Sequence, residues 1–230
     1  MLQLPKVIGH RGAAAYAPEN ALESFREARR RGATWVETDV KLTADGVPIL
    51  MHDDSFKRTT GVDRLVAETP RVELPEGVPT LEEAIACFGA LGLGCNVEIK
   101  PCPGREAETA QCAVRTLRRC WPQHLPAPLL SSFTEPSLAA ARDAAPEFDR
   151  ALLLDAFVED WRARAEALGV VGINTNGARL TGPWACAIKQ AGFVLGAYTI
   201  NDPDVARALF GMGVDFVFSD APDLILAVAG

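Results

Sequence analysis

Short apolar runs alternate with helix-like amphipathic stretches along the whole chain. Each run is four to seven residues long and apolar on successive positions, which is typical of parallel strands covered on both faces. The predicted strands are Val7–His10, Trp35–Lys41, Asn96–Lys100, Pro128–Ser132, Ala151–Leu154, Val170–Asn174, Phe193–Thr199 and Asp215–Ser219.

Helix signals separate these strands. In the stretch Asn20–Arg31 we expect Asn20 to cap the helix, with Glu23 in a capping-box position and Gly32 after the end. The capping-box spacing recurs at Thr80–Glu83. Asp202 is a further candidate N-cap, followed by Pro203 in the first helical turn. Eight β–α units in 230 residues predict a (β/α)₈ TIM barrel, which typically needs about 250 residues. We expect one domain over residues 1–230. The alternative fold is an open doubly wound sheet, but eight β–α units are more than such a sheet usually has.

One segment interrupts the alternation. Thr43–Gly46 carries an Asp-Gly turn signal, and Val47–Met51 has the pattern of a strand that returns along its neighbour. The chain is then polar and irregular up to Pro79. We therefore predict a short insertion after the second strand, at about residues 43–79, on the C-terminal face where barrel enzymes hold their active sites.

Three carboxylates fall in the interior of predicted strands. Residues two apart on a strand share a face, so Glu37 and Asp39 point the same way, as do Glu98 and Lys100. Such charges must face the barrel interior or be paired, because burying them alone is costly. A divalent cation that prefers oxygen ligands, Mg²⁺ or Ca²⁺, would relieve their mutual repulsion. The alternative is a structural network of ion pairs with Arg11, Lys41 and Lys100.

Histidine is scarce, and two of the three histidines end predicted strands. His10 ends the first strand and His52 ends the returning arm, so both are candidates for a site on the C-terminal face. His124 lies in a proline-rich loop, where we expect a surface role. The pattern around His10 and His52 thus favours chemistry over packing.

The composition limits which partners and which compartment the protein is expected to have. The net charge of −7 argues against nucleic acid and against an anionic membrane surface. No apolar run approaches the roughly 18 residues of a spanning helix, so we expect no stable membrane association. The segment Met1–Lys6 has no targeting pattern, and we expect a cytoplasmic protein. The six cysteines form no C-x-x-C pair, which argues against a disulfide framework or a zinc site.

The chain resembles the glycerophosphodiester phosphodiesterases at motifs that span almost its whole length. These motifs are His10-Arg11-Gly12, Pro18-Glu19-Asn20, Glu37-Thr38-Asp39-Val40, Asp45-Gly46-Val47-Pro48, His52-Asp53, Arg58-Thr59-Thr60-Gly61, Pro79-Thr80-Leu81-Glu82-Glu83, Val97-Glu98-Ile99-Lys100, Thr199-Ile200-Asn201-Asp202, Gly213-Val214-Asp215 and Ser219-Asp220-Ala221-Pro222-Asp223. His-Arg-Gly alone is a weak signal, whereas the ordered set is a strong one.

The resemblance implies a TIM barrel that hydrolyses a small-molecule glycerophosphodiester to sn-glycerol 3-phosphate and an alcohol. It implies an acid–base pair of His10 and His52, and we assign His10 as base and His52 as acid in the first step. It implies the glycerol 2-hydroxyl as nucleophile, giving a cyclic phosphate that water opens. The implied ligands of Mg²⁺ or Ca²⁺ are Glu37, Asp39 and Glu98, and the implied phosphate-binding cations are Arg11 and Lys100.

The chain departs from the usual family pattern at two positions. Ala21 stands where a Thr is usual, and Tyr198 stands where a Trp is common. We expect the Tyr198 ring to line the substrate site and its hydroxyl to bear on which head group is preferred. Two other functions stay open: a lysophospholipase D-type phosphodiesterase with the same residues, and a non-catalytic phosphodiester-binding barrel. The sequence does not indicate an oligomeric state.

Overall fold

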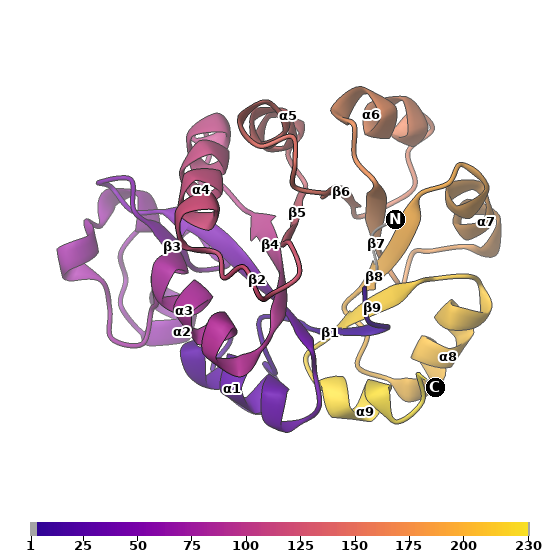
Figure 1. Ribbon diagram of the computed structural model, residues 1–230, viewed down its shortest axis with the longest axis horizontal. Coiled ribbons are helices and arrows are strands. Elements are labelled where there is room, and N and C mark those ends of the chain that lie inside the picture. Colours follow the sequence, from indigo (N-terminus) through magenta and orange to yellow (C-terminus); the bar gives the residue numbers. More distant parts are fainter. Residues whose placement is uncertain (1–3, 230) are drawn as a thin grey trace.

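A computed structural model of the chain describes residues 4–229. Its sheet is a closed barrel of parallel strands, with helices between them and around them (Figure 1). The barrel strands are β1 Val7–Gly9, β2 Trp35–Leu42, β4 Gly94–Ile99, β5 Leu129–Ser132, β6 Arg150–Leu154, β7 Gly172–Asn176, β8 Val194–Tyr198 and β9 Phe216–Ser219. The predicted TIM barrel is therefore confirmed. The start of the N-terminal segment, residues 1–3, lies outside the described residues.

The helices follow the strands in the expected alternation. They are α1 Leu22–Arg30, α3 Leu81–Leu91, α4 Glu106–Cys120, α5 Glu135–Ala144, α6 Trp161–Leu168, α7 Gly182–Gln190, α8 Pro203–Gly211 and α9 Pro222–Leu226. The capping box of Thr80 and Glu83 starts α3, and the Asp202 side chain caps α8 ahead of Pro203. Both predicted helix starts are confirmed.

Several predicted boundaries are wrong, including the start of β4, which lies at Gly94 instead of Asn96. Helix α1 begins at Leu22 after Ala21, and no side chain caps it, so Asn20 is not its cap. Asn20 has a positive φ of 56°, and its side chain binds β2 instead. Strand β7 starts two residues later than expected, because the amide of Val170 still bonds to the carbonyl of Ala165 in α6.

Hydrogen bonds between β1 and β2 close the barrel, since Gly9 pairs with Val36 while β1 also pairs with β9. The register between β2 and β4 sets Asp39 opposite Glu98. Trp35 precedes Glu37 by two residues on the same face and belongs to an apolar cluster with residues of β1, β5, β6 and β9. This cluster packs the barrel below the acids.

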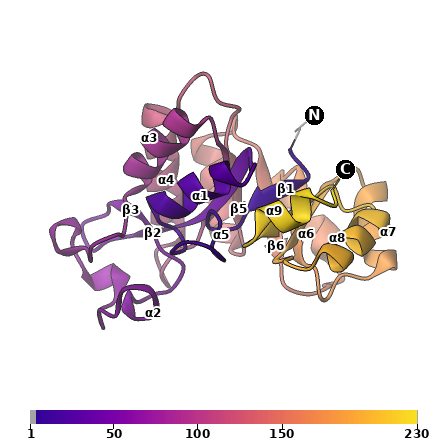
Figure 2. The same cartoon turned by 90° about the horizontal axis from the view of Figure 1, so that it is seen from below.

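The segment between β2 and α3 leaves the ring of helices. Its elements are β3 Pro48–Leu50, α2 Lys57–Thr60 and two 3₁₀ turns, Val66–Glu68 and Arg71–Glu73. Strand β3 runs antiparallel to β2 and pairs Leu50 with Val40, as the returning arm predicts. Figure 2 shows α2 at one end of the molecule, far from α7 and α8. A small apolar cluster around Phe56 packs this segment, and it also includes Cys102, which follows β4.

Candidate active site

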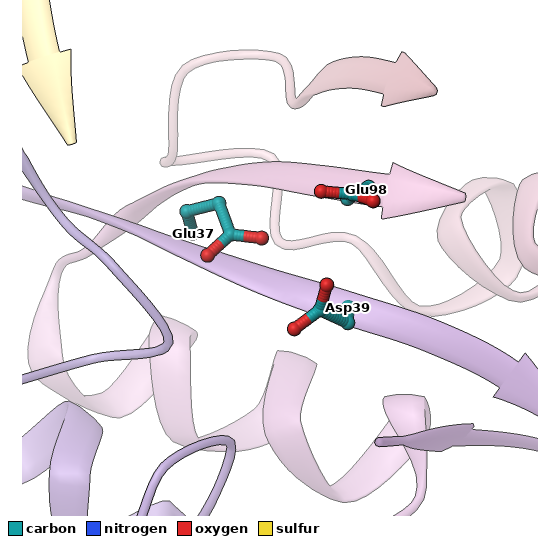
Figure 3. A group of neighbouring side chains, drawn as sticks. All are labelled: Glu37, Asp39 and Glu98. Carbon is teal, nitrogen blue, oxygen red and sulfur yellow. The ribbon is translucent and has the colours of Figure 1, made fainter. Parts of the chain in front are cut away.

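Three buried carboxylates meet at the barrel mouth. Glu37 and Asp39 project from β2, and Glu98 projects from the neighbouring strand β4 (Figure 3). One carboxylate oxygen of each lies within 4.8 Å of the others. The sequence spacing and the parallel register thus produce the convergence that was expected. Oxygen ligands at this separation suit a hard divalent cation.

The electrostatics of the cluster reflect the crowding of three buried acids. Burial and the charges of Asp39 and Glu98 raise the pKa of Glu37 well above its usual range. Burial and the charge of Asp39 raise the pKa of Glu98 to about 7. Burial also acts to raise the pKa of Asp39, but the charges of Arg11 and Lys100 outweigh it and the pKa is lowered. Protons or a cation must therefore neutralise part of the cluster near pH 7.

One atom of the cluster is free to bind an ion. The Oε2 atom of Glu37 accepts the backbone N–H of Arg11 at 2.9 Å. The Oε1 atom of Glu37 is buried and has no hydrogen-bond partner among the described residues. An unpaired buried carboxylate oxygen is costly unless something binds it. The donor set, three carboxylates with one such oxygen, therefore fits a divalent cation.

Two cations flank the acids. The Arg11 Nε lies 3.2 Å from Asp39, and Lys100 Nζ lies 3.1 Å from Glu98 and 3.7 Å from Asp39. Lys41, the third cation of the ion-pair alternative, does not join them. It is buried and binds Asp54 at 2.6 Å. The acids are thus paired with two of the three expected cations, and the cluster keeps an excess of negative charge.

A tight loop after β1 places Arg11. Arg11 itself has a positive φ of 50°, and Gly12 follows with a φ of 90°. A Cβ atom on Gly12 would stand 2.6 Å from the carbonyl carbon of Ser24 in α1. Only glycine fits this close approach. The His-Arg-Gly motif therefore turns the backbone so that the Arg11 amide faces Glu37.

Each candidate histidine is held by a carboxylate. His10 Nδ1 lies 2.7 Å from Asp220, and its Nε2 lies 3.9 Å from Glu37. His52 Nδ1 lies 2.6 Å from Asp53. Both rings therefore have their Nδ1 side bonded to an acid and their Nε2 atom available. A carboxylate in this position fixes the ring orientation and the tautomer.

Aromatic side chains line the other side of the mouth. Tyr198 and Phe133 stand edge to face with their ring centroids 5.8 Å apart. With Leu153 they border a narrow pocket of about 30 Å³ that also reaches His10 and Glu98. The Tyr198 hydroxyl donates to the carbonyl of Leu154 at 3.1 Å. This hydroxyl is thus tied to the barrel, and the ring is what borders the pocket.

Several residues of the site carry roles that the sequence did not reveal. Asn20 donates to Asp39 at 2.8 Å and accepts from Thr38. Asn201 donates to Asp220 at 2.7 Å, which steadies the partner of His10. Both lie within motifs of the family resemblance, which was the only signal that pointed to them. His124 lies away from the mouth and contacts the carbonyl of Gly89 in α3.

The site combines an acidic cluster that fits a divalent cation with two imidazoles that are each bonded to a carboxylate. A family model supplies the particular class: the "Glycerophosphoryl diester phosphodiesterase family" matches residues 10–224. The chain belongs to this family. Enzymes of this class are phosphoric diester hydrolases, and the chain is one of them.

Solved structures and curated relatives agree with the family match. A phosphodiesterase of Oleispira antarctica, in complex with the product sn-glycerol-3-phosphate, is 39% identical with a TM-score of 0.95, covering 98% of this chain and 96% of that one. A glycerophosphodiester phosphodiesterase of Thermotoga maritima is 26% identical with a TM-score of 0.80, covering 99% of each chain. A glycerophosphodiester phosphodiesterase of Bacillus altitudinis is 27% identical over 96% of each chain.

Proposed function

We propose that the protein hydrolyses glycerophosphodiesters to sn-glycerol 3-phosphate and an alcohol, with a divalent metal ion and two histidines. The observation that carries the proposal is the convergence of Glu37, Asp39 and Glu98 beside two carboxylate-bonded histidines. The likeness to the Oleispira antarctica enzyme with bound sn-glycerol-3-phosphate supports the choice of product. The substrate is a small molecule. No helix within residues 4–229 is long and apolar enough to cross a membrane.

Glu37, Asp39 and Glu98 would hold the metal, Mg²⁺ or Ca²⁺. When bound, the ion supplies positive charge that polarises the phosphoryl group and offsets the charge gained in the transition state. The charge balance of the site supports this role. With all three acids ionised, their charges against those of Arg11 and Lys100 leave one excess negative charge, which would repel an anionic diester. A divalent ion turns this into one excess positive charge.

Arg11 and Lys100 would bind the phosphate. Both side chains are largely buried and already held by the acidic cluster, so little reorganisation is needed when the anion arrives. Arg11 offers a planar set of donors that suits phosphate oxygens, and Lys100 offers a compact charge. Lys100 also lies 5.6 Å from the centroid of the Phe133 ring, so it stands between the charged and aromatic sides.

His10 and His52 would move the two protons of the reaction. We assign His10 as the base that takes a proton from the nucleophile, and His52 as the acid that protonates the leaving alcohol. The bonds to Asp220 and Asp53 support this use, because each leaves an Nε2 atom for proton transfer. The nucleophile would be the glycerol 2-hydroxyl of the substrate, and water would then open the cyclic phosphate.

The experiment is a substrate panel. Purified protein with Mg²⁺ or Ca²⁺ is incubated with glycerophosphocholine, glycerophosphoethanolamine, glycerophosphoglycerol and a lysophosphatidylcholine, and released sn-glycerol 3-phosphate is measured with its dehydrogenase. Released lysophosphatidic acid is followed by mass spectrometry. The proposal predicts glycerol 3-phosphate from at least one water-soluble diester. Faster release of lysophosphatidic acid would favour the lysophospholipase D alternative. Binding of diesters without either product would indicate the non-catalytic barrel.

A further inference from the structure

Arg58 makes an unusual set of bonds for a half-exposed side chain. It lies in α2 of the segment between β2 and α3. Its guanidinium donates to both oxygens of Glu19, at 2.8 and 2.7 Å. It also donates to both oxygens of Asp53, at 2.6 and 3.0 Å. Arg58 therefore joins two carboxylates from different segments through two bidentate pairs.

Each of these carboxylates is shared with a residue of the proposed chemistry. The Oδ1 atom of Asp53 accepts from Arg58 and also lies 2.6 Å from His52 Nδ1. The Oε1 atom of Glu19 accepts from Arg58 and from Arg11 Nη1, the latter at 2.8 Å. An unbroken series of charged contacts thus runs from His52 through Arg58 to Arg11.

The series joins two segments that are far apart in the sequence. Glu19 follows β1, whereas Arg58 lies beyond β3, 39 residues later. An isolated exposed ion pair usually adds little to stability. Here the pairs of Arg58 are bidentate and form a network. Burial acts to raise the pKa of Glu19, but the bonds from Arg58 and Arg11 outweigh burial and the pKa is lowered. The network fixes the segment carrying His52 against the loop carrying Arg11.

We propose that Arg58 is a positioning residue for the hydrolysis, which holds His52 and Arg11 in a fixed relation through Asp53 and Glu19. The inference rests on the proposed roles of His52 and Arg11. Arg58 contacts neither of them directly and acts only through the two carboxylates. The role requires arginine, because only a planar guanidinium can bind two carboxylates in bidentate fashion at once.

The expected effect follows from the loss of this fixed geometry. Residues that orient metal ligands typically contribute about 10-fold to 100-fold to activity, and we expect a factor of this order for Arg58. Arg58→Ala should lower kcat by this factor, and Arg58→Lys should recover little of it. Arg64→Ala is the matched control, because Arg64 lies in the same segment and pairs only with Glu73 among the described residues. It should keep both kcat and KM within about twofold.

The test combines chemical rescue with a double-mutant cycle. Millimolar guanidinium should restore part of the kcat of Arg58→Ala and leave Arg64→Ala unchanged. In a His52→Ala background, Arg58→Ala should cost much less than in the wild type, because the two residues act together. Circular dichroism and the thermal midpoint check that each variant is folded. If Arg58→Ala does not fold, Arg58→Lys replaces it in the kinetic comparison.

Two results would overturn the inference. The first is a kcat of Arg58→Ala equal to that of Arg64→Ala. The second is a fall in the kcat of Arg58→Ala that guanidinium does not rescue and that is fully additive with the fall caused by His52→Ala. Either result leaves the proposed function standing as long as His52→Ala itself is impaired. A fully active His52→Ala would instead contradict the proposed function. The two failures are therefore separate.

Discussion

The two sides of the barrel mouth are built differently. On the side of β1, β2 and β4, charged groups bind one another through short contacts, such as those of Arg11 with Glu19 and of Lys100 with Glu98. On the side of β5, β6 and β8, the pocket is bordered mainly by Phe133, Leu153 and Tyr198. Phe133 is 40% exposed, whereas Asp39 is 1% exposed.

If the proposed function is right, we expect the charged side to determine the reaction and the aromatic side to determine substrate preference. Buried charges need fixed partners, so the charged side has one arrangement and can serve only one chemistry. A half-exposed aromatic ring can pack against alcohols of different shape at small cost. We therefore expect changes on the charged side to reduce turnover of every substrate, and changes on the aromatic side to alter the order of substrate preference.

The histidines should give the largest effect. His10→Ala and His52→Ala should each lower kcat by about 10² to 10⁴ on natural diesters, because each removes one proton transfer. A substrate with a nitrophenolate leaving group needs little protonation, so it should rescue His52→Ala but not His10→Ala. Kinetics on both substrates check this. Equal losses on the two substrates would contradict the assignment of base and acid.

Within residues 4–229, the barrel mouth offers no evident protein nucleophile. Ser131 accepts a hydrogen bond from Asn96, and Ser132 donates to the carbonyl of Ile99, so both hydroxyls are engaged in the strands. A 2-deoxy analogue of the substrate should then bind but turn over roughly a hundredfold more slowly, since it lacks the neighbouring hydroxyl. Phosphorus NMR should detect the cyclic phosphate with the natural diester. A similar rate for both compounds would indicate direct attack by water.

Changes on the aromatic side should be smaller and selective. Phe133→Ala should raise KM about tenfold for the diesters with bulkier alcohols, which corresponds to roughly 1.4 kcal/mol of lost contact, and leave kcat nearly unchanged. Tyr198→Phe should change kcat/KM less, by about twofold to threefold, because its hydroxyl binds the Leu154 carbonyl. The substrate panel measures both. A uniform fall in kcat for Phe133→Ala would contradict the division between the two sides.

The last effect is on the stability of the metal-free protein and not on turnover. The pKa of Glu98 rises to about 7 in the folded chain through burial and the charge of Asp39, against about 4.3 in an unfolded chain. Its contribution to stability is therefore present below about pH 4 and is lost as the pH rises through 7. In EDTA at pH 8, Glu98→Gln should be more stable than the wild type by about 1–3 kcal/mol.

Urea unfolding in EDTA at pH 5.5 and pH 8 measures this difference. The control is Glu147→Gln, because Glu147 is exposed and pairs with Arg118 outside the barrel. It should show no such change with pH. Parallel pH dependence of Glu98→Gln and wild type would show that crowding of the acids does not strain the cluster.

The barrel and the centre of the charged side could be predicted from the sequence, because both depend on local patterns. Apolar runs of strand length between capped helices define the barrel, and the two-residue spacing of Glu37 and Asp39 puts them on one face. The ends of elements were less certain. Val170 is as apolar as a strand residue, yet its amide completes the last turn of α6.

Contacts between distant residues could not be predicted in this way. Asn20 and Glu23 have the spacing of a capping box, but the Asn20 side chain is taken by Asp39, 19 residues away. His10 and Asp220 are 210 residues apart and meet only because β1 and β9 are neighbours in the closed barrel. Local spacing cannot choose between a near partner and a distant one that the fold brings closer.

The central claim is that the three carboxylates act through a divalent ion, and metal removal tests it most directly. Wild-type protein is stripped with EDTA, its metal content is measured by elemental analysis, and sn-glycerol 3-phosphate release is followed before and after adding Mg²⁺ or Ca²⁺. We predict that stripped protein loses turnover and regains it with one of the two ions, and that Glu98→Gln needs a higher ion concentration. Full turnover by protein shown to contain no metal would contradict the account.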